Sequence, residues 1–321
     1  MHPRLVAPLF ALAALAAAER SARAQACCVS TSAIFPARLA DDENGLVGVA
    51  VKGSTVFGSY DGQRVLHGEP GNASELDLGQ TLLVTGRIAD EPVQINVSVP
   101  FVETYRSVPG SSAFGGGVGD VSFSMRWDVV TDERDHVVPG IAPLLSVTVP
   151  SGTPIEMAKD PLGTDATGLG AAQLGAGVAL EKMFGRTLFA ITGTATFHGS
   201  RTVSGVHSQL GPDLAATVAA SYTFKRGPSL GAAITYTGSF DSSIADASVP
   251  YSARALTTLA LVGALPLRDD TRLLGSLFFV PPISGIGQNE LGAVGLSLTL
   301  IYGLATRPAR CTCADGTCHP R

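Results

Sequence analysis

Two histidines stand among serines in one short stretch of the chain, and a hydrolase needs both residue types. The stretch contains His198, Ser200, Ser204, His207 and Ser208. A hydrolytic triad requires a serine nucleophile, a histidine base and an orienting acid held at one point. A spacing as short as this is more typical of a polar loop. These residues therefore favour a hydrolase only weakly, and the sequence predicts no enzyme.

Two further motifs could bind ligands. The run Gly115–Gly119 could cradle a phosphate, but a phosphate loop needs a helix after it and usually a lysine, and neither follows. A glycine-rich hairpin fits this run better. Asp160 and Asp165 could offer oxygen ligands to Ca²⁺, but too few further ligands accompany them. The sequence predicts no cofactor and no resident metal.

The composition narrows the class of protein. Of 321 residues, 45% are hydrophobic and only 15% are charged, against roughly 25% charged in soluble domains. Beyond the N-terminus there is no uninterrupted run of about 20 apolar residues, which excludes a bundle of membrane helices. The chain has 37 glycines and 20 prolines, which favours short strands and turns. A net charge of −5 offers no footprint for nucleic acid.

The first residues have the pattern of an export signal. His2 and Arg4 precede an apolar stretch, 5–18, and small residues follow up to Ala26. We predict a signal peptide over 1–26. Cleavage after Ala26 would leave Cys27 first, as in a lipoprotein, but Ala24 stands where lipoproteins normally carry leucine. Lipidation stays open.

From Leu46 onward the sequence alternates with period two, the period of strands. The segment 93–99 is the cleanest example, with valine and isoleucine alternating with Gln94, Asn96 and Ser98. The second face is mostly small and polar rather than charged. This distribution fits a barrel whose apolar face meets lipid and whose polar face meets the lumen. We predict an all-β fold: a transmembrane, antiparallel, up-and-down β-barrel of about twelve strands.

The connections between these strands alternate in length. Short ones are expected at 89–92, 131–136, 184–186, 225–228 and 267–271, and long ones at 62–72, 108–119, 151–168, 200–212, 239–249 and 281–290. Outer-membrane barrels have short periplasmic turns and longer outer loops. Both ends of the barrel should therefore lie on the periplasmic side. The expected parts are a periplasmic segment over 27–44, a barrel over 45–303 and a cysteine-containing tail over 304–321.

Strand parity assigns a set of polar side chains to the lumen. They are Lys52, Glu75, Asp77, Arg87, Arg126, Asp128, Gln173 and Glu181. Charges of both signs could line a pore, and they could equally brace the barrel by ion pairs across its interior. Twelve strands lie between the filled eight-stranded and the open sixteen-stranded barrels. Whether the lumen is open is left undecided.

The cysteines are confined to the two ends of the chain. They are Cys27, Cys28, Cys311, Cys313 and Cys318. Export to an oxidising compartment favours disulfides, and both ends of a closed barrel emerge side by side. We expect at least one bridge between the N-terminal pair and the tail. A soft metal held by the tail cysteines and His319 is the alternative.

One region resembles a known family. The run Gly115–Asp120 enters a strand that carries Arg126 and Trp127, and 147–153 leads through a long loop into a glycine-rich strand at 169–177. This arrangement resembles the outer-membrane transporter-like barrels of the meta-pathway phenol-degradation family. The resemblance implies a barrel for the passage of small, aromatic compounds, with no catalytic residues to carry over.

These observations lead to one expected function. We expect a channel or facilitator in the outer membrane of a Gram-negative cell, for passive uptake of small molecules, with aromatic or hydrophobic ones among them. The alternative is a structural or surface-interaction barrel that conducts nothing, and an outer-membrane hydrolase is the third and weakest alternative. The expected partners are outer-membrane lipid, a small solute and the barrel-assembly machinery, for which the apolar last strand, 295–302, is a recognition signal.

Overall fold

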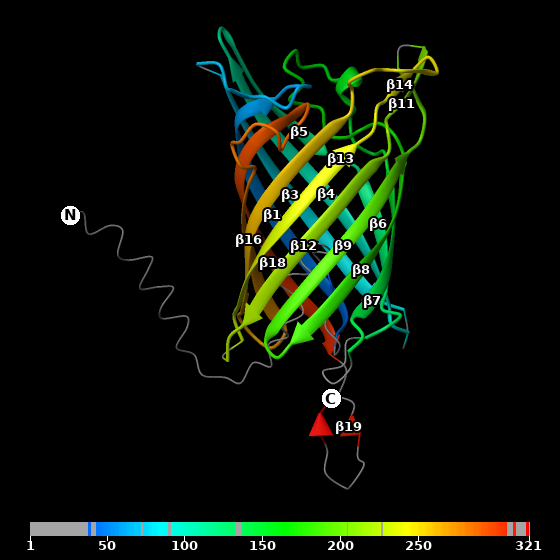
Figure 1. Ribbon diagram of the computed structural model, residues 1–321, viewed down its shortest axis with the longest axis vertical. Coiled ribbons are helices and arrows are strands. Elements are labelled where there is room, and N and C mark those ends of the chain that lie inside the picture. Colours follow the sequence, from blue (N-terminus) through cyan, green and yellow to red (C-terminus); the bar gives the residue numbers. More distant parts are fainter. Residues whose placement is uncertain are drawn as a thin grey trace, which may run out of the picture.

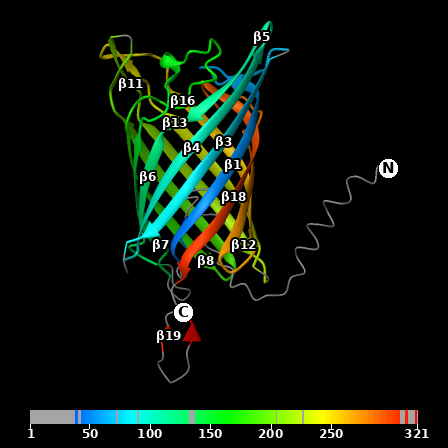
Figure 2. The same cartoon turned by 180° about the vertical axis from the view of Figure 1, so that it is seen from behind.

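The computed structural model describes residues 38–39, 43–71, 73–88, 91–131, 137–203, 205–225, 227–306, 311–312 and 319–320. Its main sheet has fourteen strands, and all of them except β2 (Leu66–Gly68) and β5 (Ser111–Val118) form the closed wall of a barrel (Figures 1 and 2). The predicted twelve-stranded antiparallel barrel is confirmed. None of the described helices is long and apolar enough to cross a membrane.

The twelve wall strands follow one another around the barrel in chain order, and β1 closes it by pairing with β18. They are β1 (Glu43–Tyr60), β3 (Ser74–Arg87), β4 (Val93–Val108), β6 (Val121–Trp127), β7 (Gly140–Val149), β8 (Gln173–Phe184), β9 (Thr187–His198), β12 (Asp213–Thr223), β13 (Ser229–Ser239), β16 (Arg254–Pro266), β17 (Thr271–Phe279) and β18 (Glu290–Thr306). The barrel thus extends slightly beyond the expected 45–303 at both ends.

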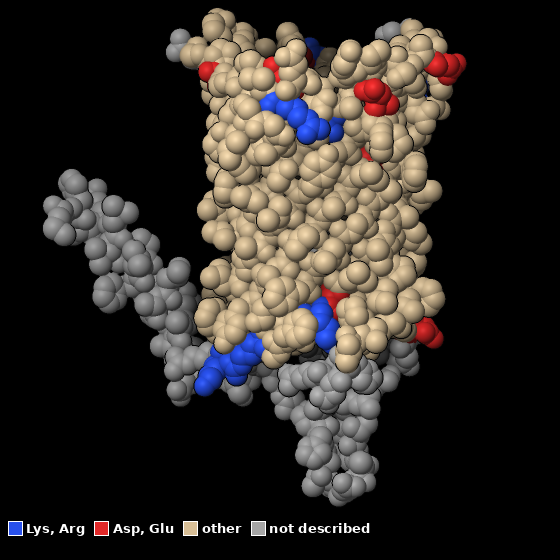
Figure 3. Space-filling model, in the orientation of Figure 1, with Lys and Arg blue, Asp and Glu red and all other residues tan. Residues whose placement is uncertain are grey.

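Period two decides which side chains face outward. On β4, Ile95, Val99 and Phe101 are exposed, whereas Gln94 and Asn96, which point the other way, are buried. The wall in Figure 3 shows the result, because charged side chains on that face gather toward the two ends of the barrel. An apolar outer band between two charged rims is the surface that a bilayer requires.

The connections between wall strands fall alternately at the two ends of the barrel. The inner end, as we call it here, carries 88–92, 128–139, 185–186, 224–228 and 267–270; the outer end carries 61–73, 109–120, 150–172, 199–212, 240–253 and 280–289. The connection 128–139 is longer than predicted because β6 ends at Trp127 and β7 begins only at Gly140.

Four of the outer connections contain strands that the sequence did not predict. In 61–73, β2 pairs with the outer end of β1. In 109–120, β5 pairs with the outer half of β4. In 199–212 and 240–253, β10 (Arg201–Val203), β11 (Val206–Gln209), β14 (Ser243–Ile244) and β15 (Ala247–Ser248) form a separate four-stranded sheet. Of these strands, those outside 109–120 are only two to four residues long, too short for an alternating pattern, and β5 is rich in glycine, which hides its alternation.

The glycine run begins in β5 and ends one residue after it, at Gly119, and it packs against the connection 150–172. Within the described residues β5 pairs only with β4, while β6 continues the wall to β7. A Cβ atom on Gly115 would lie 2.7 Å from Oγ1 of Thr164, and one on Gly119 would lie 3.0 Å from the carbonyl oxygen of Thr167. These glycines therefore allow two backbones to approach closely.

The two termini are described only in part. The predicted signal peptide over 1–26 lies outside the described residues, as do Cys27, Cys28, Cys313 and Cys318. In the tail, β19 (Cys311–Thr312) pairs with β20 (His319–Pro320). The disulfide between the two ends stays a prediction.

Candidate functional site: the barrel interior

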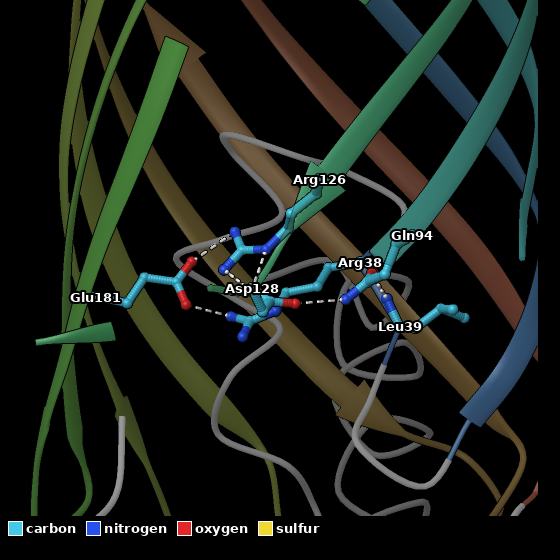
Figure 4. A network of polar contacts seen from close by, with 6 residues as sticks. All are labelled: Arg38, Leu39, Gln94, Arg126, Asp128 and Glu181. Carbon is cyan, nitrogen blue, oxygen red and sulfur yellow. Dashed lines mark hydrogen bonds and ion pairs between the residues drawn. The ribbon is translucent and has the colours of Figure 1, made fainter. Parts of the chain in front are cut away.

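Arg126 is the centre of a charged network at the inner end of the barrel (Figure 4). Its side chain, on β6, is only 2% exposed. One terminal nitrogen, Nη2, lies 2.7 Å from Oδ1 of Asp128, and Nη1 lies 2.8 Å from Oε1 of Glu181 on β8. A buried guanidinium is tolerated only when it is paired in this way.

Arg38 and Leu39, which precede β1, also contact this network. Nη1 of Arg38 lies 2.6 Å from Oε2 of Glu181. The backbone N–H of Leu39 donates to Oε1 of Gln94 over 2.9 Å, and Gln94 in turn donates to Asp128 over 3.0 Å. Arg38 and Leu39 thus lie inside the barrel, although the sequence placed them in a periplasmic segment over 27–44.

An apolar cluster and a second ion pair fix the same segment. Leu39 packs with four inward-facing side chains, those of Leu46, Leu83, Leu274 and Ile301. Glu43 forms a two-pronged pair with Arg272, with N–O distances of 2.5 and 3.0 Å. Arg272 also donates to the backbone oxygen of Arg38 over 3.2 Å. The inner end is therefore filled on this side by a tightly held piece of chain.

A second group of charged side chains points into the barrel near its outer end. Arg106 lies 3.0 Å from Glu75 and donates to the backbone oxygen of Leu162 over 2.8 Å. Thr104 donates to Asp77 over 2.9 Å. These contacts tie β3 and β4 to the connection 150–172.

The connection 150–172 is fixed across the outer end by several polar contacts. The carboxylate of Asp120 accepts the backbone N–H groups of Gly152, over 2.9 Å, and Leu169, over 2.8 Å. Arg201 pairs with Glu156 at 2.5 Å and also donates to the backbone oxygen of Leu169. This loop is therefore a docked part of the interior rather than a free outer loop.

Small side chains predominate on the inward face of one sector of the wall, although larger ones such as Leu188 and Val262 also lie on that face. The sector comprises five adjacent strands, β8, β9, β12, β13 and β16. Across them the pairing register aligns two rows of residues: Ala179, Thr192, Thr217, Thr235 and Thr258 in the first, and Ala190, Ala219, Ala233 and Ala260 in the second. Oγ1 of Thr217 lies 3.0 Å from Oγ1 of Thr235. We call these five strands the small-residue sector.

The histidines do not form a triad within the described residues. Nδ1 of the buried His198 lies 3.0 Å from the backbone oxygen of Gly211, and Nε2 lies 3.3 Å from Oδ2 of Asp213. His207 is exposed and pairs with Asp246 at 3.1 Å. The structure gives neither histidine a serine partner among the residues that it describes.

The two aspartates considered for calcium cap a turn instead. Asp165 accepts the backbone N–H of Lys159 over 2.8 Å, and Asp160 accepts that of Leu162 over 2.8 Å. Hydrogen bonds from the backbone, with that of Lys159 the largest, lower the pKa of Asp165. The described residues hold no group of three His, Cys, Asp or Glu side chains suited to a metal.

The comparisons with known proteins bear on the fold. The barrel has the fold of a solved outer-membrane channel. This is the COG4313 outer membrane channel from Pseudomonas putida F1, with a TM-score of 0.66, 15% sequence identity, and coverage of 83% of this chain and 99% of that one. The transport unit of the autotransporter AIDA-I from Escherichia coli is less similar, with a TM-score of 0.47, 10% identity, and coverage of 85% and 95%.

The sequence comparisons add no family. No family model matches the chain, and no curated protein matches it. The broader resemblance, to outer-membrane channel barrels, is confirmed at the level of fold. The narrower one, to the meta-pathway phenol-degradation family, stays an expectation.

The eight predicted lumen residues fall into separate groups. Arg126, Asp128 and Glu181 meet in one network, while Glu75 and Asp77 contact β4. The other three lie apart: Lys52 has its amino group 4.6 Å from the ring centre of Phe278, Arg87 donates to the backbone oxygen of Glu43, and Gln173 lies opposite His198 in the register.

Four important residues were missed by the sequence reasoning. Gln94 and Arg272 have the inward parity of their strands, and that signal could have found them. Arg38 and Glu43 stand at or before the start of β1, where no period exists to read.

Proposed function

We propose that the chain is an outer-membrane channel or facilitator for the passive uptake of small molecules, with hydrophobic or aromatic ones among them. The observation that carries the proposal is the small-residue sector inside a barrel whose outer face is apolar. Methyl and hydroxymethyl groups take little space, so five adjacent strands contribute a thin lining. Such a lining narrows the barrel less than long side chains would.

The lining of the sector also suits weakly polar solutes. The first row offers the hydroxyl groups of its threonines, and the second offers the methyl groups of its alanines. Glu181 is the charged residue at the edge of the second row. Hydroxyl groups form hydrogen bonds with uncharged polar groups of a solute, so the solute need not be an ion. An apolar molecule with one polar group would find partners along this wall.

Passage through the inner end requires the segment at Arg38 and Leu39 to move. These residues are anchored by an ion pair, two hydrogen bonds of their backbone and an apolar cluster. We propose that this segment controls the exit from the lumen. The barrel wall can stay intact while the segment shifts.

Measurements in planar bilayers and in liposomes test the proposal. Purified, refolded protein should give discrete conductance steps and should admit small uncharged solutes in a swelling assay. A heat-dependent shift in gel mobility confirms beforehand that the barrel has folded. Correctly folded protein that stays silent in both assays contradicts the proposal.

The second candidate is a barrel that conducts nothing and serves a structural or surface role. The buried network around Arg126 favours it, because ion pairs and Leu39 fill the inner end on one side. The two candidates differ in whether the barrel conducts, which the bilayer assay measures directly. Silence in both assays would support the structural role.

A further inference from the structure

A cavity of about 180 Å³ lies at the outer end of the barrel. It is lined by residues of the connections 150–172, 199–212 and 240–253 and by two strand ends of the small-residue sector, where Ser239 ends β13 and Arg254 begins β16. Ser239 and Arg254 face each other in the register. Ser239 shares its face of β13 with Thr237 and Thr235, so the cavity stands at the head of this sector.

Two arginines supply hydrogen-bond donors to the cavity lining. Arg201 uses its two terminal nitrogens on Glu156 and Leu169, while its buried Nε finds no acceptor among the described residues. Arg254 donates from Nε to Ser239 over 3.3 Å and is 44% exposed. A guanidinium has five N–H donors, so the exposed Arg254 keeps donors for a ligand, whereas the spare Nε of Arg201 is buried.

The charges around the cavity are already balanced. Arg201 has Glu156 at 2.5 Å, and Arg254 has Glu290 at 3.4 Å. A carboxylate ligand would meet these glutamates as like charges, and a cationic ligand would meet the arginines. Spare donors in a balanced environment select an uncharged acceptor, such as a carbonyl oxygen.

Three apolar side chains of the lining set the size of the ligand, and Ser242 adds one hydroxyl group. Ile155, Leu169 and Leu210 supply the apolar side chains. An apolar cavity of about 150 Å³ holds benzene. The cavity therefore has room for one six-membered ring with a small substituent.

We propose that this cavity binds an uncharged organic molecule of one-ring size that carries a single acceptor oxygen, such as an aromatic ketone or aldehyde. Arg254 donates to the oxygen, and the leucines and Ile155 contact the ring. The role of the cavity as an entry site for uptake rests on the proposed function. Binding itself does not, because it can be measured without any passage of solute.

Fluorine NMR titrations of the full, refolded protein in one detergent test the proposal. Three fluorinated probes of similar size are compared: 4-fluoroacetophenone, 4-fluorotoluene and 4-fluorobenzoate. The ketone should bind most tightly, because the other two lack either the acceptor or the required neutrality. Tighter binding of the benzoate than of the ketone would overturn the proposal.

Substitutions separate the polar from the apolar contribution. Arg254→Leu should weaken ketone binding by about fivefold to tenfold, the effect of one lost hydrogen bond, and should leave the toluene unchanged. Leu210→Trp, which fills the cavity, should weaken both probes. Arg268→Leu, in an exposed turn at the inner end, is the matched control and should change neither.

The outcomes distinguish the site from the transport role. Ketone affinity that is equal in the original protein and in Arg254→Leu overturns the proposal, and this variant serves even where Leu210→Trp fails to show the heat-dependent gel shift of a folded barrel. Binding that follows the expected pattern in a protein that is silent in bilayers supports the cavity and contradicts only the proposed passage.

Discussion

Arg126 and Glu181 meet inside the barrel across an intervening strand. The first is on β6 and the second on β8, and their side chains approach to 2.8 Å over β7. Arg126 lies opposite Leu144 in the register, and Glu181 lies opposite Gly140. The inward residue of β7 between those two is Ala142, which is 1% exposed. A methyl group at this point leaves the pair room to form.

Removing the acid of this pair should destabilise the barrel strongly. Glu181→Leu removes one ion pair from Arg38 and one from Arg126, and breaking a buried pair from one side costs about 3–5 kcal/mol. The chain's single tryptophan, Trp127, follows Arg126 directly and faces outward, so its fluorescence reports unfolding by urea in lipid vesicles. Asp269→Asn, in an exposed turn, is the control, and an equally small effect of both variants would contradict the role of the pair.

Loosening the segment before β1 should increase conductance. The double variant Arg38→Gln and Leu39→Ser removes one ion pair and the apolar anchor while leaving every wall strand unchanged. We expect longer or larger openings in planar bilayers, together with an unchanged heat-dependent gel shift. Arg268→Gln should behave as the original protein does. An unchanged conductance in the double variant would mean that this segment does not control the exit.

The wall of the barrel could be predicted from the sequence because period two is a local property. Each strand such as 93–99 reports by itself which side chains face lipid. The pairing of β5 with β4 could not be predicted in this way, since the glycines of β5 carry no side chains whose alternation could be read. The role of these glycines is to let the connection 150–172 approach closely, and that contact depends on the folded structure.

The interior was predictable in residue type but not in partnership. Parity placed Arg126 and Glu181 on the inward face, yet the period gives no information on which inward residues meet. Arg38 could not be predicted as their neighbour, because the contact joins residues that are 143 positions apart in the chain. Partnership in a barrel depends on closure and register, which are properties of the whole sheet.

The carboxylate of Asp165, which caps a turn, should stay ionised at a lower pH than that of an ordinary aspartate, because its pKa is lowered. Backbone N–H donation, with that of Lys159 the largest, places the pKa below the ordinary 3.8. Because the folded pKa is the lower one, the stabilisation is present above the unfolded value and is lost as the pH falls through the folded value. Carbon-detected NMR of the Asp165 carboxyl should give a midpoint below 3.8, and a midpoint above it would show that the cap is absent in solution.

Two glycines of β5 offer a matched pair of substitutions that test how the connection 150–172 is docked. An added Cβ at Gly115 would lie 2.8 Å from the carbonyl carbon of Thr164, which is backbone and must shift, whereas at Gly117 the nearest atom lies at 3.6 Å, an ordinary contact. Gly115→Ala should therefore release the connection and speed its cleavage in limited proteolysis, while Gly117→Ala should not.

The matched design removes the usual ambiguity of a glycine substitution. Both variants place alanine on the same strand and the same face, so loss of backbone freedom affects them alike. The difference between them reports the close approach alone. The heat-dependent gel shift should be kept in both, because β5 lies outside the closed wall. Equal cleavage rates in the two variants would show that Thr164 does not pack on β5, and the glycine run would then need another explanation.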